Sequence, residues 1–285
     1  MNKKKFYNPV KFYAITLIVV MIPGFLAAYF SYIPELKSMV TLFIAIGLFS
    51  PAVIALIMIY KSENNKVLVD DLKNRFFRLK GLNILSIFVV VALMPLSIII
   101  SIFISVLMGF SLGQFQFSPE ITIVSGELFL SLAILLLAPT LEEIGWRGYG
   151  VDALRSKFNL FNTTLIFYVI WSVWHIPLFF IKGYYHNTLL NPYPYYAVNF
   201  FLSLLPLVFI MNWLYYKTDR SIVVLILFHF MVNFSAEFMM VDDFTKCIQT
   251  FVLLIPAIVI IWKEKDLFFK LEAIFITEFS QLHEN

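Results

Sequence analysis

Apolar runs of about 20 residues recur along this chain, and they constrain its fold more than any other feature. An α-helix rises roughly 1.5 Å per residue, so a run of this length crosses the hydrocarbon core of a bilayer. Strands of a membrane barrel would be shorter and would alternate between apolar and polar residues, and no such segments are visible. The runs therefore predict an all-α, polytopic membrane bundle.

The composition agrees with a membrane protein and limits its partners. Hydrophobic residues make up 61% of the sequence and charged residues 14%, whereas soluble domains have roughly 45–50% apolar and about 25% charged residues. The net charge of +3 lies in short loops, so it gives no reason to expect a nucleic-acid partner. The single Cys247 excludes an internal disulfide and a cysteine-cluster metal site. The lipid bilayer is the expected surrounding.

About eight transmembrane helices are expected, and nothing divides the chain, so residues 1–285 are predicted to form a single integral membrane domain. The runs are Phe12–Tyr32, Met39–Tyr60, Leu82–Phe110, Ile121–Leu141, Phe161–Ile181, Tyr195–Tyr216, Ser221–Val241 and Lys246–Trp262. Between the second and third runs, Lys61–Lys80 is predicted to be a charged loop. Gly145–Asn159 is expected to lie partly along the membrane interface.

Positive charge gathers on one side of this predicted topology. The loops on that side contain Lys3–Lys5, Lys61–Lys80, Arg147–Lys157, Lys217–Arg220 and Lys263–Lys265, while the opposite loops keep Lys37, Lys182 and Lys246. Loops rich in Lys and Arg stay in the cytoplasm. We therefore expect a multi-pass protein of the cell membrane with both termini cytoplasmic. The abundance of Lys, Ile, Asn and Phe favours a bacterial source with AT-rich codons.

Two adjacent carboxylates, Glu142 and Glu143, stand at the end of the apolar run that begins near Ile121. Arg147 follows Glu143 by four residues, which places both side chains on one helix face in the order that favours an ion pair. Glu142 points roughly 100° away and lacks this partner. We expect Glu143 to be fixed structurally and Glu142 to be free for chemistry.

Later runs contain polar side chains that are costly in a membrane and usually functional. His175 lies in the fifth run, and His229, Asn233 and Glu237 form one polar stripe on the seventh, four residues apart. Burying such groups separately costs free energy, so we expect one cavity that opens to the cytoplasmic side. The groups expected to face it are Glu142, Glu143, His175, His229 and Asn233.

The surroundings of three other side chains are also predicted. Glu237 is expected to have a structural partner on a neighbouring helix, while His186 and His283 are predicted to be ordinary surface residues.

The depth of the Glu pair in the membrane stays open. The pair would be shallow if its helix ended at the pair. Tilt, a kink near Pro139 or a helix that continues through Trp146 would bring the pair to the depth of the histidines.

Three motifs resemble the CPBP family of intramembrane peptidases, which contains CAAX proteases and bacteriocin-processing enzymes and is also called Abi. The family pattern Glu-Glu-x-x-x-Arg matches Glu142–Arg147 in full. Trp171–His175 matches Phe-x-x-x-His with Trp in place of Phe, and His229–Asn233 matches His-x-x-x-Asn. The motifs lie in a catalytic core at about 121–241, whereas the first three runs resemble the family only in being hydrophobic.

The resemblance implies an endopeptidase and a role for each motif residue. Glu142 would be the general base that activates water, assisted by His175. His229 and Asn233 would polarise the scissile carbonyl and hold its oxyanion, supported by the Glu143–Arg147 pair. The residue types suit amide hydrolysis, which needs a base and donors aimed at an oxyanion.

A zinc site is the alternative for the same groups. Two histidines and a glutamate are also the ligands of a catalytic zinc, and here they would be Glu142, His175 and His229. No His-Glu-x-x-His helix is present, and the ligands would come from three separate runs. We therefore favour a glutamate mechanism without a cofactor.

Two classes of function remain open at this point. The leading hypothesis is an intramembrane endopeptidase, similar to a CAAX prenyl protease, that cleaves a membrane-associated or leader peptide. The alternative is a non-enzymatic membrane protein, such as a bacteriocin-immunity or scaffold factor. A transporter is less favoured because the chain shows neither repeated halves nor paired broken helices.

Overall fold

The computed structural model describes residues 6–118 and 126–271, and this part of the chain is a helical bundle. Its only β feature is an isolated bridge between Phe117 and Met239. The predicted all-α membrane bundle is confirmed. The helices are α1 Pro9–Phe30, α2 Lys37–Tyr60, α3 Asn65–Phe76, α4 Ile84–Leu107, α5 Gly126–Gly145, α6 Val151–Arg155, α7 Leu160–His175, α8 Tyr185–Thr188, α9 Tyr195–Lys217, α10 Ile222–Phe238, α11 Asp243–Lys263 and α12 Lys265–Phe269.

Six helical segments of the described chain are long and apolar enough to cross a membrane: Pro9–Phe30, Pro34–Tyr60, Ile84–Leu107, Leu160–Phe180, Tyr195–Lys217 and Asp243–Lys263. The other two predicted spans also appear as helices. The described part of α5 has 20 residues and contains the Glu pair, and α10 is an apolar helix of 17 residues. The expected count of about eight is therefore not confirmed by length and composition, although every predicted span contains a helix.

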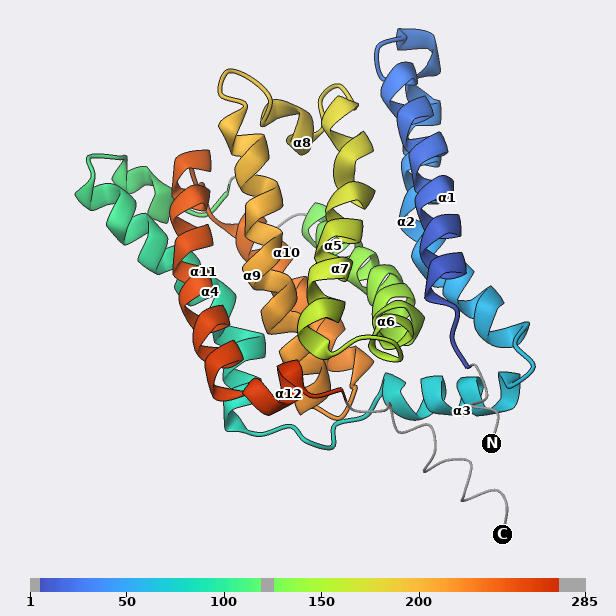
Figure 1. Cartoon of the computed structure of the whole chain (residues 1–285). Coiled ribbons are helices and arrows are strands. Elements are labelled where there is room, and N and C mark those ends of the chain that lie inside the picture. The colour runs from blue at the N-terminus through green and yellow to red at the C-terminus, as the bar shows by residue number, and fades with distance from the viewer. Residues whose placement is uncertain (1–5, 119–125, 272–285) are drawn as a thin grey trace.

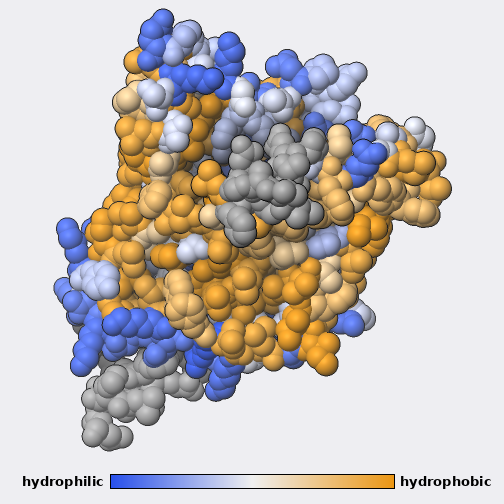
Figure 2. All heavy atoms as spheres, turned by 180° about the vertical axis from the view of Figure 1, so that it is seen from behind, coloured by the Kyte–Doolittle hydropathy of each residue, from blue (hydrophilic) through white to orange (hydrophobic). Residues whose placement is uncertain are grey.

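The long helices stand side by side, and short helices lie at opposite ends of the bundle (Figure 1). α3 lies across the end where α2 and α11 finish, and α8 lies at the other end. α1 packs on α2, α2 on α5, α4 on α10 and α11, and α9 on α7 and α11. A broad apolar band separates two hydrophilic ends (Figure 2), as expected for a protein surrounded by lipid.

The helix that contains the Glu pair continues beyond it. α5 passes into a π-helical turn, Trp146–Gly150, and then into α6, which ends at Arg155. Residues 146–155 are all buried inside the bundle, whereas residues 156–158 are exposed, and the partly interfacial position of Gly145–Asn159 stays a prediction. Of the arrangements left open by the sequence, the structure has the helix that continues through Trp146. The two carboxylates therefore lie within a continuous helix.

The charged segment between α2 and α4 is not only a loop. Residues 65–76 form α3, whose inner face buries Leu68, Asp71 and Arg75. The Arg75 guanidinium donates to the backbone oxygens of Arg147, at 3.0 Å, and Gly148, at 3.1 Å. Carbonyls in a π-helical turn depart from the regular i to i−4 ladder, and here a side chain from α3 satisfies two of them. α3 thereby supports the segment next to the Glu pair.

A buried charge cluster fixes this arrangement. It consists of two acids and two bases: Asp71, Arg75, Asp152 and Arg220. Arg75 pairs with Asp71 and Asp152, each at 2.9 Å, and Arg220 pairs with Asp71 at 2.9 Å and Asp152 at 2.5 Å. Formal charges balance within the cluster, which offsets the cost of taking them out of water. It closes the bundle on the side of the basic loops.

Candidate active site

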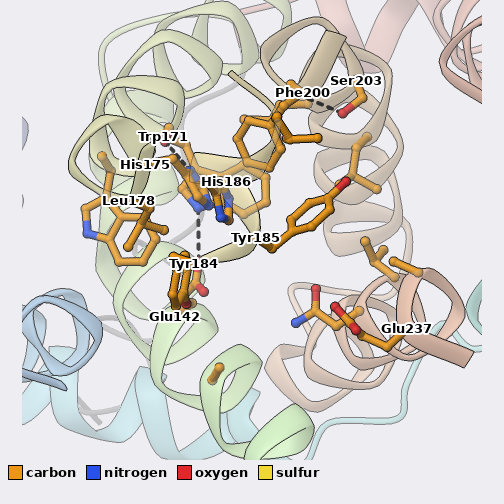
Figure 3. A pocket seen from close by; sticks show the side chains of 18 of the residues that line it. Glu142, Trp171, His175, Leu178, Tyr184, Tyr185, His186, Phe200, Ser203 and Glu237 are labelled. Atoms are coloured by element: carbon orange, nitrogen blue, oxygen red, sulfur yellow. Dashed lines mark hydrogen bonds between the residues drawn. The ribbon is translucent and has the colours of Figure 1, made fainter. Parts of the chain in front are cut away.

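The Glu142 carboxylate is oriented by two tryptophans. Its Oε2 atom accepts hydrogen bonds from Nε1 of Trp171, at 3.0 Å (Figure 3), and from Nε1 of Trp146, at 3.4 Å. An indole N–H only donates, so both rings stabilise the carboxylate as an acceptor. These tryptophans look like packing residues in the sequence, because any apolar membrane helix could use them in that way. No donor to the other oxygen, Oε1, is found in the described part of the chain.

Glu143 binds two partners at once. It pairs with Nη1 of Arg147 at 2.9 Å, which confirms the ion pair expected from their spacing. Its Oε1 atom also accepts from Nδ1 of His229 at 2.9 Å. Glu143 and Arg147 are fully buried, and Arg147 donates further to Asn212 at 3.3 Å. Because Glu143 occupies Nδ1 of His229, Nε2 is the ring atom that remains for other partners.

His175 is held by the backbone of its own helix. Its Nδ1 lies 2.7 Å from the carbonyl oxygen of Trp171, and a carbonyl only accepts, so Nδ1 is the protonated nitrogen. In the neutral ring Nε2 then carries a lone pair. The Trp171 indole lies against both histidines, with its ring centroid 5.3 Å from that of His175 and 5.6 Å from that of His229. This tryptophan therefore connects Glu142 with the two histidines.

One cavity of about 540 Å³ brings most of the expected site residues together. Glu142, His175, His229 and Asn233 all line it, from α5, α7 and α10. Glu143 does not line the cavity; it lies behind His229, which it orients. A carboxylate, two imidazoles and an amide thus share one space inside an apolar bundle, and this set of groups suits hydrolysis of an amide bond.

Comparison with known proteins agrees with this geometry. Residues 124–235 match a family described as "Type II CAAX prenyl endopeptidase Rce1-like". A protein of Methanococcus maripaludis named "CAAX prenyl protease 2" is 40% identical over 264 residues, which cover 93% of this chain and 97% of that protein. The chain belongs to the CAAX prenyl protease family. It is a helical membrane endopeptidase, and the immunity, scaffold and transporter alternatives are not supported.

Among the described residues, the lining of this protease's cavity includes none of the basic loops. Its lining extends to Tyr185, Asp243 and Lys246, at the end of the bundle where α8 lies. On the other side of Glu142 the space is filled by Trp146 and Arg147, both with 0% exposure. The expected cytoplasmic opening and the expected cytoplasmic position of the basic loops therefore cannot both hold.

His186 is not the ordinary surface residue that the sequence predicts. α8 places its ring in the cavity wall, 6.0 Å from the ring of His175 and within 22° of parallel to it. Neither ring nitrogen has a hydrogen-bond partner among the described residues, although both are buried. Burial lowers the pKa of His186 from 6.5 to about 4. A four-residue helix between two spans leaves no periodic pattern that would have revealed this position.

The structure differs from the prediction for Glu237. Glu237 lines the cavity and is exposed, and within residues 6–118 and 126–271 no hydrogen bond or ion pair reaches its carboxylate, so the expected structural partner is not found. Its side chain lies in the last turn of α10, in the wall of the cavity (Figure 3). His283 lies outside the described residues.

The zinc alternative is not supported by the arrangement of possible ligands. In the described part of the chain, no three His, Cys, Asp or Glu side chains are grouped so that they could hold a metal ion. The set Glu142, His175 and His229 therefore lines a common cavity without forming a ligand cluster.

Proposed function

We propose that this protease cleaves a prenylated, membrane-associated peptide close to its carboxyl end, with Glu142 as the general base. The substrate class follows from the name of the Methanococcus maripaludis relative. An apolar cavity with a few convergent polar groups suits a lipid-modified peptide. The observation that carries the proposal is the Glu142 carboxylate, fixed by two indoles and lining the same cavity as His175 and His229.

The proposed reaction begins with a water held between Glu142 and Nε2 of His175. Glu142 takes a proton from this water as its oxygen attacks the scissile carbonyl carbon. The carbonyl oxygen gains negative charge, which Nε2 of His229, when protonated, and the Asn233 amide stabilise by donating hydrogen bonds. The C–N bond then breaks, and the proton passes from Glu142 to the leaving amine. Water has supplied the new carboxylate oxygen.

The Glu143–Arg147 pair supports this chemistry through His229, on the side of the ring away from the cavity. Glu143 accepts from Nδ1 of His229 and so fixes the ring with Nε2 available to the substrate, as a carboxylate does for many catalytic histidines. Arg147 balances the charge of Glu143 in a fully buried position. We further propose that residues 121–241 are the catalytic core and that both termini are cytoplasmic, because the basic loops lie together at one end of the bundle.

Cleavage of a prenylated CAAX peptide by the purified protein tests the proposal. The comparison needs wild type, Glu142→Gln and Glu35→Gln, a matched change at an exposed position outside the cavity. Loss of the base should lower kcat by at least about 10²-fold, while Glu35→Gln should cleave like wild type. If Glu142→Gln cleaved at the wild-type rate, Glu142 would not be the base.

A further inference from the structure

The cavity contains one cationic side chain among its described lining residues. Lys246, in the first turn of α11, is the only Lys or Arg of that lining. Its ammonium donates to the hydroxyl of Tyr185 at 2.7 Å and to Asp243 at 3.3 Å, and it lies 4.3 Å from the centroid of the Tyr185 ring. An ammonium has three N–H donors, so one remains for a ligand in the cavity.

A second donor of the lining, Asn199 on α9, lies next to the following turn of α11. Asn199 also lines the cavity, and its Oδ1 accepts from Thr250 at 2.9 Å. Thr250 contacts the backbone oxygen of Lys246 at 3.1 Å, which places Asn199 within one helical turn of the lysine. In this arrangement the amide nitrogen of Asn199 has no acceptor among the described residues. The Lys246 ammonium reaches the opposite way along α11, to Asp243 and Tyr185, so the Asn199 amide lines a neighbouring part of the same cavity.

The other charged groups of the lining are acids. Glu142, Glu237 and Asp243 would repel an anion, and Asp243 is already paired with Lys246. An unpaired carboxylate in an apolar cavity is expensive, and a charge-assisted hydrogen bond to an ammonium offsets that cost. A ligand with one carboxylate therefore finds its favourable position at Lys246, at the α8 end of the cavity.

We infer that Lys246 binds the C-terminal carboxylate of the peptide substrate. This inference rests on the proposed function. A CAAX peptide has three residues after its modified cysteine, and these span at most about 11 Å when extended. Its carboxylate therefore belongs to the released segment and lies away from the cleaved bond. Anchoring that end would fix which peptide bond lies at Glu142, and would make the enzyme selective for a free chain end.

The test compares a prenylated CAAX peptide with a free carboxylate and the same peptide with a C-terminal amide. Wild type should cleave the acid with a kcat/KM at least about tenfold higher, mainly through KM. Lys246→Met keeps an apolar stem without the charge. In this variant the kcat/KM for the acid should lie within about twofold of the kcat/KM for the amide. Lys246→Arg should keep a preference for the acid, which separates loss of charge from misfolding.

Lys182→Met is the matched control. This lysine lies at the same end of the bundle, with its ammonium 5.8 Å from the Tyr32 ring and outside the cavity lining. It should leave the ratio unchanged. Equal cleavage of acid and amide by wild type would overturn the inference while the peptidase activity stands.

A binding experiment tests the inference independently of catalysis. The released tripeptide, as acid and as amide, is tested as a ligand of wild type and Lys246→Met by competition with the labelled substrate peptide. Tighter binding of the acid by wild type alone supports the carboxylate site, even if neither peptide is cleaved. Failure of the proposed function would appear instead as absence of cleavage in wild type. Equal binding of acid and amide would remove the carboxylate site.

Discussion

Glu142 and Glu143 are neighbours in sequence, but they meet different donors. Glu142→Gln keeps the shape of the side chain and an oxygen for the two indoles, so it should abolish cleavage with little change in melting temperature. Glu143→Gln and Arg147→Ala each leave a fully buried charge without its partner, which costs about 3–5 kcal/mol. These two should therefore lower both activity and the free energy of unfolding.

Melting curves in detergent and a cleavage assay of the same variants check this prediction. The double change at Glu143 and Arg147 should be less than additive in free energy, because each single change already removes the same interaction. A stable but inactive Glu143→Gln together with an active Glu142→Gln would exchange the two roles.

His186 should make stability depend on pH. Burial lowers its pKa from 6.5 to about 4, so between these values the unfolded chain binds more protons than the folded protein. The resulting stability is present above about pH 6.5 and is lost as the pH falls toward 4, by at most about 3 kcal/mol. His186→Phe, which suits the surrounding Phe179 and Phe200 rings, should reduce this dependence. Melting temperatures of both proteins at pH 7 and pH 5 measure it, and equal slopes would contradict it.

The sequence identified those site residues whose pattern has one simple physical meaning. The spacing of Glu143 and Arg147 on a helix left few alternatives to an ion pair, and the cost of burying His175 and His229 marked them as functional. Trp171 stood out only through the Trp171–His175 motif and not through its chemistry, because an indole packs in apolar surroundings whether or not its N–H has a partner. Lys246 looked like one of three loop lysines until the fold placed it in the cavity wall.

At the scale of elements, apolar runs predicted the long helices and missed the short ones. A helix that spans a bilayer needs about 20 apolar residues, so the length of each apolar run is enough to predict a spanning helix. α3 is not an apolar run, since its buried face includes Asp71 and Arg75, which pair with each other and also with partners far away in sequence. The π-helical turn after Gly145 depends on the same tertiary contacts. Neither could have been predicted from local pattern alone.

The contact between α2 and α5 gives a prediction at this scale. A methyl group on Gly145 would collide with the backbone and ring of Pro51, which cannot move without shifting α2. Gly145→Ala should therefore lower the free energy of unfolding by at least about 1–3 kcal/mol, as overpacking does, and displace Glu142 enough to reduce cleavage. Thermal melting and the cleavage assay measure both effects.

Gly148→Ala is the control for this change, in the same helical segment. Its methyl group would meet only the end of the Leu72 side chain, at 3.2 Å, which can rotate away. It should be close to wild type in stability and activity. If the two alanine variants behaved alike, the close approach of α2 and α5 would not be what holds the Glu pair in place.

At the scale of the whole molecule, the basic loops and the surface end of the cavity lie at opposite ends of the bundle. The basic loops lie at the α3 end, and the cavity lining reaches the surface at the α8 end (Figure 1). The positive-inside rule puts the α3 end in the cytoplasm, so the cavity would face outward. The sequence could not reveal this conflict, because the direction of a cavity depends on which side of Glu142 is filled by Trp146 and Arg147.

Cysteine labelling in intact cells should decide the orientation. The chain has a single cysteine, so Cys247→Ser provides a background in which Glu63→Cys reports the α3 end and Tyr193→Cys the α8 end, both at exposed positions. We expect a membrane-impermeant maleimide to label Tyr193→Cys in intact cells and Glu63→Cys only after lysis, because moving the many Lys and Arg side chains of the α3 end outward opposes the rule that fixes topology. The reverse pattern would place the cavity mouth in the cytoplasm. It would overturn the charge-based orientation and leave the geometry of the site unchanged.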